Sequence, residues 1–310
     1  MNTQHLFVRT LRKFKLLRYL NLTSTIEVNK QTYKIPLQAG FGLDNLFMSE
    51  PWMTRLLEKL KPFFTGAFVD VGVNIGQTLI KAHSVNKNVN YIGFEPNAVC
   101  VHYVQELIKL NNIKNCKLIP VGVNDQSGVL KLNFFYSDET DSTASIIDNF
   151  RPGESVDHFN YVPVFEYRHL QSLLPEIGHC ILKIDVEGAE LEVLKTFGEW
   201  IMQCQPLIIL EILPVYKPDN HFRLSRQHEI EKLLNSWNYQ MSRVNKKGEI
   251  RLTKISEIGV HGDLDNCDYV LYPIELEPGL RSILDAKTET KALLKEPMPV
   301  DGQEAVESEA

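Results

Sequence analysis

The strongest constraint on the fold is a change of pattern near Ala67, where short apolar runs rich in β-branched and aromatic residues begin to alternate with helix-length segments. The apolar runs cover residues 68–71, 91–94, 117–123, 180–184 and 207–212. They are continuous rather than alternating, which is typical of strands in a parallel sheet that helices cover on both faces. The pattern therefore predicts a doubly wound α/β domain with a Rossmann-like sheet.

The segments between and after these runs have the length and spacing of helices, at residues 78–83, 99–110, 190–197 and 227–237. A further pair of strands, 239–244 and 269–272, would complete a mostly parallel seven-stranded sheet with an antiparallel edge. We place this core domain at residues 61–284. A longer excursion at 129–170 contains one strand-like run and a polar stretch, and long insertions of this kind tend to be functional.

An N-terminal extension at residues 1–60 precedes the core, and it should hold a basic helix, a hairpin at 25–28 and 32–37, and a helix at 51–60. The first 26 residues contain no acid. Apolar residues at helical spacing interleave with the basic residues Arg9, Arg12, Lys13, Lys15 and Arg18. This amphipathic helix could pack on the domain with a solvated polar face, or contact an anionic membrane surface or a partner. The acidic tail at 285–310 loses its apolar periodicity, and we expect it to be disordered.

Composition excludes several classes of protein. With 44% hydrophobic and 23% charged residues the chain is neither disordered nor fibrous, and a net charge of −6 argues against a nucleic-acid partner. Five cysteines lie far apart with no metal-binding or redox spacing, which predicts ordinary thiols in a reducing compartment. No long uncharged apolar run is present, so a soluble cytoplasmic protein is the expectation.

Parallel α/β sheets bind ligands beyond the carboxyl ends of their strands. After the first strand the chain places Asp70, Gly72, Asn74 and Gly76 at intervals of two residues. A dinucleotide fingerprint would need glycine two and five residues after Gly72, where this chain has Asn74 and Gln77. The loop suits a ligand with an ammonium group and no phosphate, although a glycine-rich turn can also serve packing alone.

Two further strand ends carry candidate cofactor ligands. Glu95 follows Asp70 by 25 residues, where such folds hold an acid that accepts both ribose hydroxyls. Pro96 suits the first turn of the next helix. Asn124 and Asp125, after the third strand, could lie near an adenine edge, or they could form an Asx turn.

The fourth strand ends in the most specific string, KIDVEGAE at 183–190. Because side chains alternate along an extended segment, Asp185 and Glu187 should project on one side. Two carboxylates aimed into a cleft require a cation, a proton or a polar ligand between them. Acids favoured at the start of a helix are the competing explanation, and that explanation accounts poorly for Asp185.

The strings FVDVGVNIGQT, YIGFEPN, LIPVGVNDQSG, ILKIDVEGAELEVLK and PLIILEI occur in this order. Together they resemble the S-adenosylmethionine-dependent methyltransferases of the FkbM type. The resemblance implies a class I methyltransferase fold that transfers a methyl group from S-adenosyl-L-methionine to a hydroxyl, often on a sugar, a glycan or a natural product. One departure is Tyr167-Arg168, where the family tends to have Leu-Asp.

The resemblance assigns Asp70, Gly72, Asn74 and Gly76 to the methionine part of the cofactor. It assigns Glu95 to the ribose and Pro96, Asn124 and Asp125 to the adenine, and it implies that Asp185 and Glu187 face the methionine end and the acceptor.

Methyl transfer from a sulfonium needs few catalytic groups, since the cofactor already carries the activation. Asp185 or Glu187 is the expected general base or acceptor-orienting group, with Glu211 in reserve and no metal. The excursion at 129–170 is the expected lid. Two alternatives stay open, a nicotinamide-dependent oxidoreductase and a non-catalytic scaffold that kept the fold.

Overall fold

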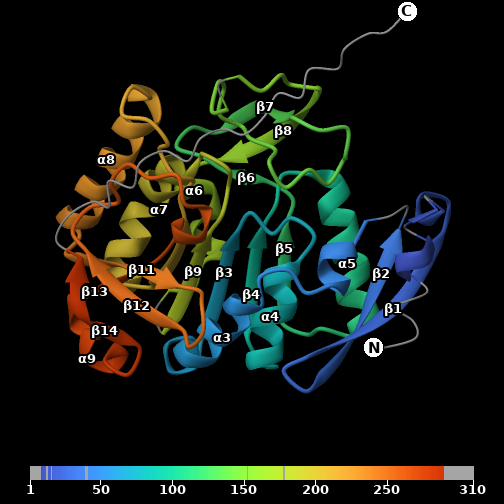
Figure 1. Cartoon of the computed structure of the whole chain (residues 1–310), viewed down its shortest axis with the longest axis horizontal. Coiled ribbons are helices and arrows are strands. Elements are labelled where there is room, and N and C mark those ends of the chain that lie inside the picture. The colour runs from blue at the N-terminus through green and yellow to red at the C-terminus, as the bar shows by residue number, and fades with distance from the viewer. Residues whose placement is uncertain are drawn as a thin grey trace, which may run out of the picture.

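The computed structural model describes residues 8–11, 13–14, 16–38, 41–151, 153–176 and 179–289. Its centre is a sheet with strand order β14-β12-β11-β13-β10-β9-β3-β4-β5, and helices cover both faces of this sheet (Figure 1). The predicted doubly wound α/β class is therefore confirmed.

The five predicted parallel strands form the middle and one edge of the sheet. They are β3 (Ala67–Val71), β4 (Asn90–Phe94), β5 (Cys116–Ile119), β9 (Cys180–Ile184) and β10 (Leu207–Glu211). The sheet continues past β10 with β13 (Asp268–Pro273), β11 (Tyr239–Asn245), β12 (Arg251–Ile255) and β14 (Leu284–Glu289). β13 runs antiparallel to both β10 and β11, as expected for the far edge.

The sheet has two more strands than predicted, because β12 and β14 extend it beyond β11. Arg251 and Lys254 interrupt the apolar run of β12, and β14 has the polar sequence LDAKTE, so neither segment carries the signal of a buried strand. β14 also shows that ordered structure continues past the expected domain end at 284. Residues 285–289 of the tail predicted at 285–310 are thus in a strand, and the rest of that tail, from 290 onward, lies outside the described residues.

The long helices divide between the two faces of the sheet. α3 (Pro51–Leu60), α4 (Gln77–Val85) and α5 (Ala98–Asn111) pack on one face, and α7 (Glu190–Cys204) and α8 (His221–Ser236) pack on the other. Phe68 belongs to the first core and Val69 to the second, as alternation along a strand requires. The shorter helical segments are α2 (Leu43–Leu46), η2 (Lys61–Phe63), α6 (Tyr167–Leu170), η3 (Gln171–Leu173), η4 (Leu264–Asn266), η5 (Ile274–Leu276) and α9 (Glu277–Leu280).

The third predicted strand is shorter than expected, because the chain leaves the sheet at Pro120. Proline has no N–H group to continue a strand ladder. The following residues form β6 (Gly122–Val123), which pairs in a separate three-stranded sheet of order β6-β8-β7. β7 (Gly128–Phe134) and β8 (His158–Phe165) build this small sheet within the predicted excursion, above the carboxyl ends of the central strands (Figure 1).

The N-terminal extension packs beside α5 (Figure 1). The predicted hairpin is β1 (Asn21–Val28) paired with β2 (Gln31–Gln38), preceded by η1 (Leu17–Tyr19). The hydroxyl of Tyr103 in α5 donates a hydrogen bond to the carbonyl of Pro36 at 2.9 Å.

Residues 8–11 and 13 are helical, while Arg12 and Lys15 lie outside the described residues. Phe14 and Tyr19 are 66% and 71% exposed. Contact with an anionic membrane or a partner stays a prediction. Among the described residues, no helix has the length and apolar character that a membrane span needs.

Candidate functional site

A cavity of about 730 Å³ opens at the carboxyl ends of β3, β4, β9 and β10. Its walls come from the loops that follow these strands, from the N-terminal extension at 41–50, and from the excursion at 132–146. The predicted residues that line the cavity are Gly72, Asn74, Glu95, Pro96, Asp185, Glu187 and Glu211. The carboxyl edge of the sheet thus carries the large pocket, as the strand order predicts.

The loop after β3 is shaped by one close backbone approach. A Cβ atom at Gly72 would lie 1.8 Å from the carbonyl oxygen of Asp185, and Gly72 has a φ of +90°, so glycine is required at this position. Asn74 adopts a left-handed conformation, with a φ of +46°, which asparagine tolerates better than most residues. Both residues line the cavity.

Two members of the same motif do not line the cavity. Asp70 is 0% exposed and accepts a hydrogen bond from the hydroxyl of Tyr91, and its other oxygen lies 3.8 Å from the ammonium of Lys183. Burial raises the pKa of Asp70 to about 6. Gly76 caps the start of α4 with a φ of +79°. Asp70 and Gly76 therefore support the residues that line the cavity and are not part of the lining themselves.

Glu95 is the acid at the end of β4, and it is 6% exposed. The backbone N–H of Asn74 donates to Oε2 at 2.7 Å, and the backbone N–H of Asn97 donates to Oε1 at 2.8 Å. Burial raises its pKa to about 7. Pro96 precedes Asn97, the N-cap of α5, so it lies before the helix rather than in its first turn.

Asn124 and Asp125 lie outside the cavity lining. The backbone N–H of Asn124 donates to the carbonyl of Phe165 at 3.1 Å, and its side chain donates to the carbonyl of Gln126 at 3.1 Å. Asp125 is exposed. The break at Pro120 turns this segment into the small sheet, so the geometry favours the turn over the adenine-edge assignment.

Asp185 follows the last residue of β9 and pairs with Lys183, whose Nζ lies 2.9 Å from Asp185 Oδ2. Burial opposes ionisation of Asp185, but the Lys183 ammonium outweighs burial and lowers the pKa of the carboxyl. Lys183 is 4% exposed and lines the cavity between Asp70 and Asp185. The sequence alone did not indicate this role, although Lys183 belongs to the KIDVEGAE string.

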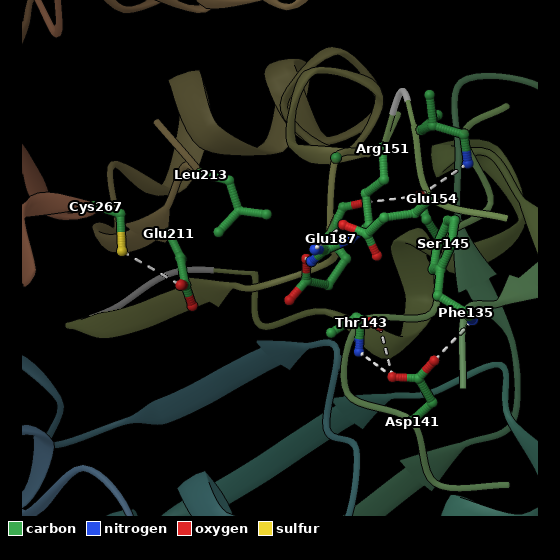
Figure 2. A network of polar contacts seen from close by, with 12 residues as sticks. Phe135, Asp141, Thr143, Ser145, Arg151, Glu154, Glu187, Glu211, Leu213 and Cys267 are labelled. Atoms are coloured by element: carbon green, nitrogen blue, oxygen red, sulfur yellow. Dashed lines mark hydrogen bonds and ion pairs between the residues drawn. The ribbon is translucent and has the colours of Figure 1, made fainter. Parts of the chain in front are cut away.

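Glu187 reaches the cavity by a route that differs from the predicted one. Its φ is +49°, so a turn and not strand alternation brings Glu187 and Asp185 to the same cavity. Arg151 donates to the Glu187 carboxylate at 2.7 Å, and the Ser145 hydroxyl donates to the Glu187 carbonyl at 2.6 Å (Figure 2). Burial and the Asp185 charge raise the pKa of Glu187 to about 7.

Glu211 ends β10 and also lines the cavity. Burial and the Asp185 charge raise the pKa of Glu211, which favours its protonated form. Cys267 donates to its carboxyl at 3.4 Å (Figure 2). Within the described ranges, Glu211, Cys267 and Asp268 are the acids and thiols grouped closely enough to hold a metal, but Lys246 already forms an ion pair with Asp268.

A strap at residues 135–151 borders the cavity, inside the predicted lid. Asp141 organises its turn by accepting hydrogen bonds from the backbone N–H of Phe135 at 2.9 Å and from the N–H and hydroxyl of Thr143 at 2.9 and 2.6 Å (Figure 2). The strap is tied to the start of α5 through Asn97, whose side-chain amide donates to the Glu139 carbonyl at 2.7 Å. Its ties to the β9 loop are the Ser145 and Arg151 contacts with Glu187.

A family model described as "Methyltransferase FkbM domain" matches residues 70–241, which is more than half of this chain. The chain belongs to the FkbM methyltransferase family. The matched region starts at Asp70 and contains the loops after β3, β4 and β9 and the strap.

Other comparisons agree with the family assignment. A curated protein named Methyltransferase 1 from Beauveria bassiana is 24% identical over 148 residues, which is 43% of this chain and 59% of that protein. The aligned part of the chain thus spans less than two thirds of that relative's length.

Arg168, at the position where the FkbM resemblance leads one to expect an acid, has a 72% exposed side chain and pairs with Glu166 at 2.6 Å.

Two solved structures are similar to this chain at low identity. An O-methyltransferase from Bacillus cereus in complex with SAH is 11% identical with a TM-score of 0.40, covering 71% of this chain and 78% of that one. A putative caffeoyl-CoA O-methyltransferase from Staphylococcus aureus is 10% identical with a TM-score of 0.39, covering 85% and 90%.

Proposed function

We propose that this protein transfers a methyl group from S-adenosyl-L-methionine to a hydroxyl of a sugar, a glycan or a natural product. The observation that carries the proposal is the cavity at the carboxyl ends of β3, β4 and β9, where Glu95, Asp185 and Glu187 converge. The FkbM family assignment supports methyl transfer, and the geometry of these three acids suggests how the chain would perform it.

The residues of the cavity fit this cofactor. Among the charged side chains of the described lining eight are acidic and one, Lys183, is basic, which suits a ligand that carries a sulfonium and an ammonium group. Each Glu95 oxygen accepts one N–H and keeps a lone pair for a ribose hydroxyl. A volume of about 730 Å³ lies in the range of cofactor sites. When bound, the cofactor supplies an activated methyl group.

The two acceptor-side carboxylates have different roles in this proposal. Asp185 stays ionised beside Lys183 and orients the acceptor, because a carboxylate with a lowered pKa is a weak base. Glu187 has a pKa of about 7, which is matched to removing a proton near neutral pH. Glu187 is therefore the general base, and Arg151 positions its carboxylate.

The decisive experiment combines cofactor binding with a search for the acceptor. Calorimetry should detect S-adenosylhomocysteine and no NAD, and mass spectrometry of candidate glycans should reveal the gain of one methyl group from labelled cofactor. Glu187→Gln should lower turnover by about 10² to 10⁴ with little change in cofactor affinity. Wild-type turnover should rise as the pH rises through about 7, since the base must be deprotonated.

Glu199→Gln, an exposed acid in α7, is the matched control and should leave turnover unchanged. The absence of heat with S-adenosylhomocysteine would favour a scaffold, and binding of NAD would favour an oxidoreductase. Full turnover by Glu187→Gln on an identified acceptor would reject Glu187 as the base.

A further inference from the structure

Two cysteines that are distant in sequence meet at the amino end of β9. Cys180 is the first residue of β9 and Cys204 is the last residue of α7, and their Sγ atoms lie 3.2 Å apart. All five cysteines fall within the described residues and are thiols. Cys100 and Cys267, in contrast, direct their thiols at oxygen atoms of Asn74 and Leu264.

The two sulfurs differ in accessibility and in acidity. Cys180 is 2% exposed, whereas Cys204 is half-buried. A hydrogen bond between the two thiols lowers the pKa of Cys204 and raises that of Cys180, and burial raises the pKa of Cys180 further. Because the thiolate is the reactive form, Cys204 is placed to react first and Cys180 to react with the product.

We propose that Cys204 and Cys180 form an oxidisable dithiol that a peroxide converts into an intramolecular disulfide. The Cys204 sulfur attacks one peroxide oxygen, the O–O bond breaks, and a sulfenic acid and one water form. The Cys180 sulfur then attacks the Cys204 sulfur, the S–O bond breaks, and the hydroxyl leaves with the Cys180 proton as a second water. Two thiols are oxidised by two electrons, and one peroxide is reduced to two waters.

The link would close the β9–α7 unit at the end opposite the cavity. β9 separates Cys180 from Asp185, a distance of roughly 15 Å for a strand of this length. The disulfide would restrain the unfolded chain without moving the Asp185–Glu187 turn, so it should stabilise the fold and leave the cavity intact. This inference does not depend on the proposed methyl transfer.

The experiment uses the full-length protein, reduced, desalted and treated with hydrogen peroxide. Non-reducing digestion and mass spectrometry should find the Cys180–Cys204 peptide pair with two hydrogens lost, and thiol titration in denaturant should fall from five thiols to three. The melting temperature should rise by roughly 5–10 °C, and dithiothreitol should reverse the rise. Affinity for S-adenosylhomocysteine, measured as a separate readout, should not change.

Cys204→Ser should abolish both the linked peptide and the thermal shift, and Cys116→Ser, at another partly buried cysteine, should abolish neither. The proposal is overturned if wild-type Cys204 proceeds to sulfinic acid with no linked peptide. It is equally overturned if peroxide raises the melting temperature of Cys204→Ser as much as that of the wild type. The wild-type digest decides the question even if Cys204→Ser fails to fold.

Discussion

Lys183 shows how single residues control the charge of the site. Its ammonium lies between Asp70 and Asp185, and all three groups are partly or fully removed from water. An ion pair in this setting contributes little net stability, but removing one partner leaves the other charges uncompensated. Lys183 is therefore needed for the two acids to remain ionised.

We expect Lys183→Met to lower the free energy of unfolding by about 3–5 kcal/mol near neutral pH. Without the ammonium, the pKa values of Asp70 and Asp185 should rise. A carboxyl whose pKa is higher in the folded than in the unfolded state destabilises the fold increasingly as the pH rises toward the folded-state pKa. The loss in free energy of unfolding should therefore be larger at about pH 8 than at about pH 5.5. Chemical denaturation at both pH values measures this loss.

Lys195→Met provides the matched control, because the Lys195–Glu229 pair is 41% and 49% exposed. Its cost should stay below about 1 kcal/mol at either pH. Equal costs for the two lysine variants would contradict the role assigned to Lys183.

At the scale of elements, the strap at 135–151 is the part of the cavity wall with the least regular structure. Neither a helix nor a strand covers residues 135–151, so a β-bridge between Asn133 and Ser145, a few backbone turns and hydrogen bonds made by side chains hold the segment in shape. Asp141 alone accepts four of these bonds, from Phe135, Tyr136 and Thr143. One carboxylate therefore organises a turn that lines the cavity.

Asp141→Ala should loosen this turn, because it leaves four donors without their acceptor at a cost of about 1–3 kcal/mol each where they stay buried. Limited proteolysis should cut within 135–151 at least about tenfold faster, a factor that corresponds to about 1.4 kcal/mol of local opening. Asp125→Ala, at an exposed acid outside the strap, should keep the wild-type cleavage rate. An unchanged rate for Asp141→Ala would show that other contacts hold the strap.

At the scale of the whole molecule, the carboxyl edge of the sheet gathers acids that burial makes hard to ionise. The pKa values of Glu95, Glu187 and Glu190 rise to about 7, and that of Asp70 rises to about 6. Between about pH 4.5 and pH 7 the folded protein therefore holds more protons than the unfolded chain. Its stability should fall as the pH rises through this window.

Glu190 tests this linkage without entering the cavity. It is 6% exposed at the start of α7 and accepts the N–H of Gly188 at 2.8 Å. Glu190→Gln mimics the protonated acid, so it should match the wild type near about pH 5.5. At about pH 8.5 it should be more stable by roughly 2 kcal/mol, a rise of about 4–8 °C in melting temperature.

The control for this pH series is Glu199→Gln in the same helix, which should follow the wild-type curve because Glu199 is exposed. If Glu190→Gln has the same pH dependence of melting as the wild type, Glu190 does not contribute to the linkage.

The sequence by itself determined the elements and the edge of the sheet where the site lies. Continuous apolar runs identified the five parallel strands, and Gly72, Asn74, Glu95, Asp185 and Glu187 were correctly placed at the strand ends. These features are local, since periodicity and glycine conformation depend on neighbours in the chain. Pro120 was also visible, and the rule that proline interrupts a ladder would have shortened the third strand.

The tertiary structure decided which buried groups face one another. Lys183 with Asp70, Arg151 with Glu187, and Cys180 with Cys204 each pair through the packing of separate elements or of opposite ends of one βα unit. The spacing of residues in the sequence does not determine such pairs. Distance and burial in the folded chain decide whether two side chains meet, and they also set the pKa of an acid and decide which thiols can react with each other. The polar strands β12 and β14 were hidden for the same reason, since only an existing sheet edge gives their backbones a partner.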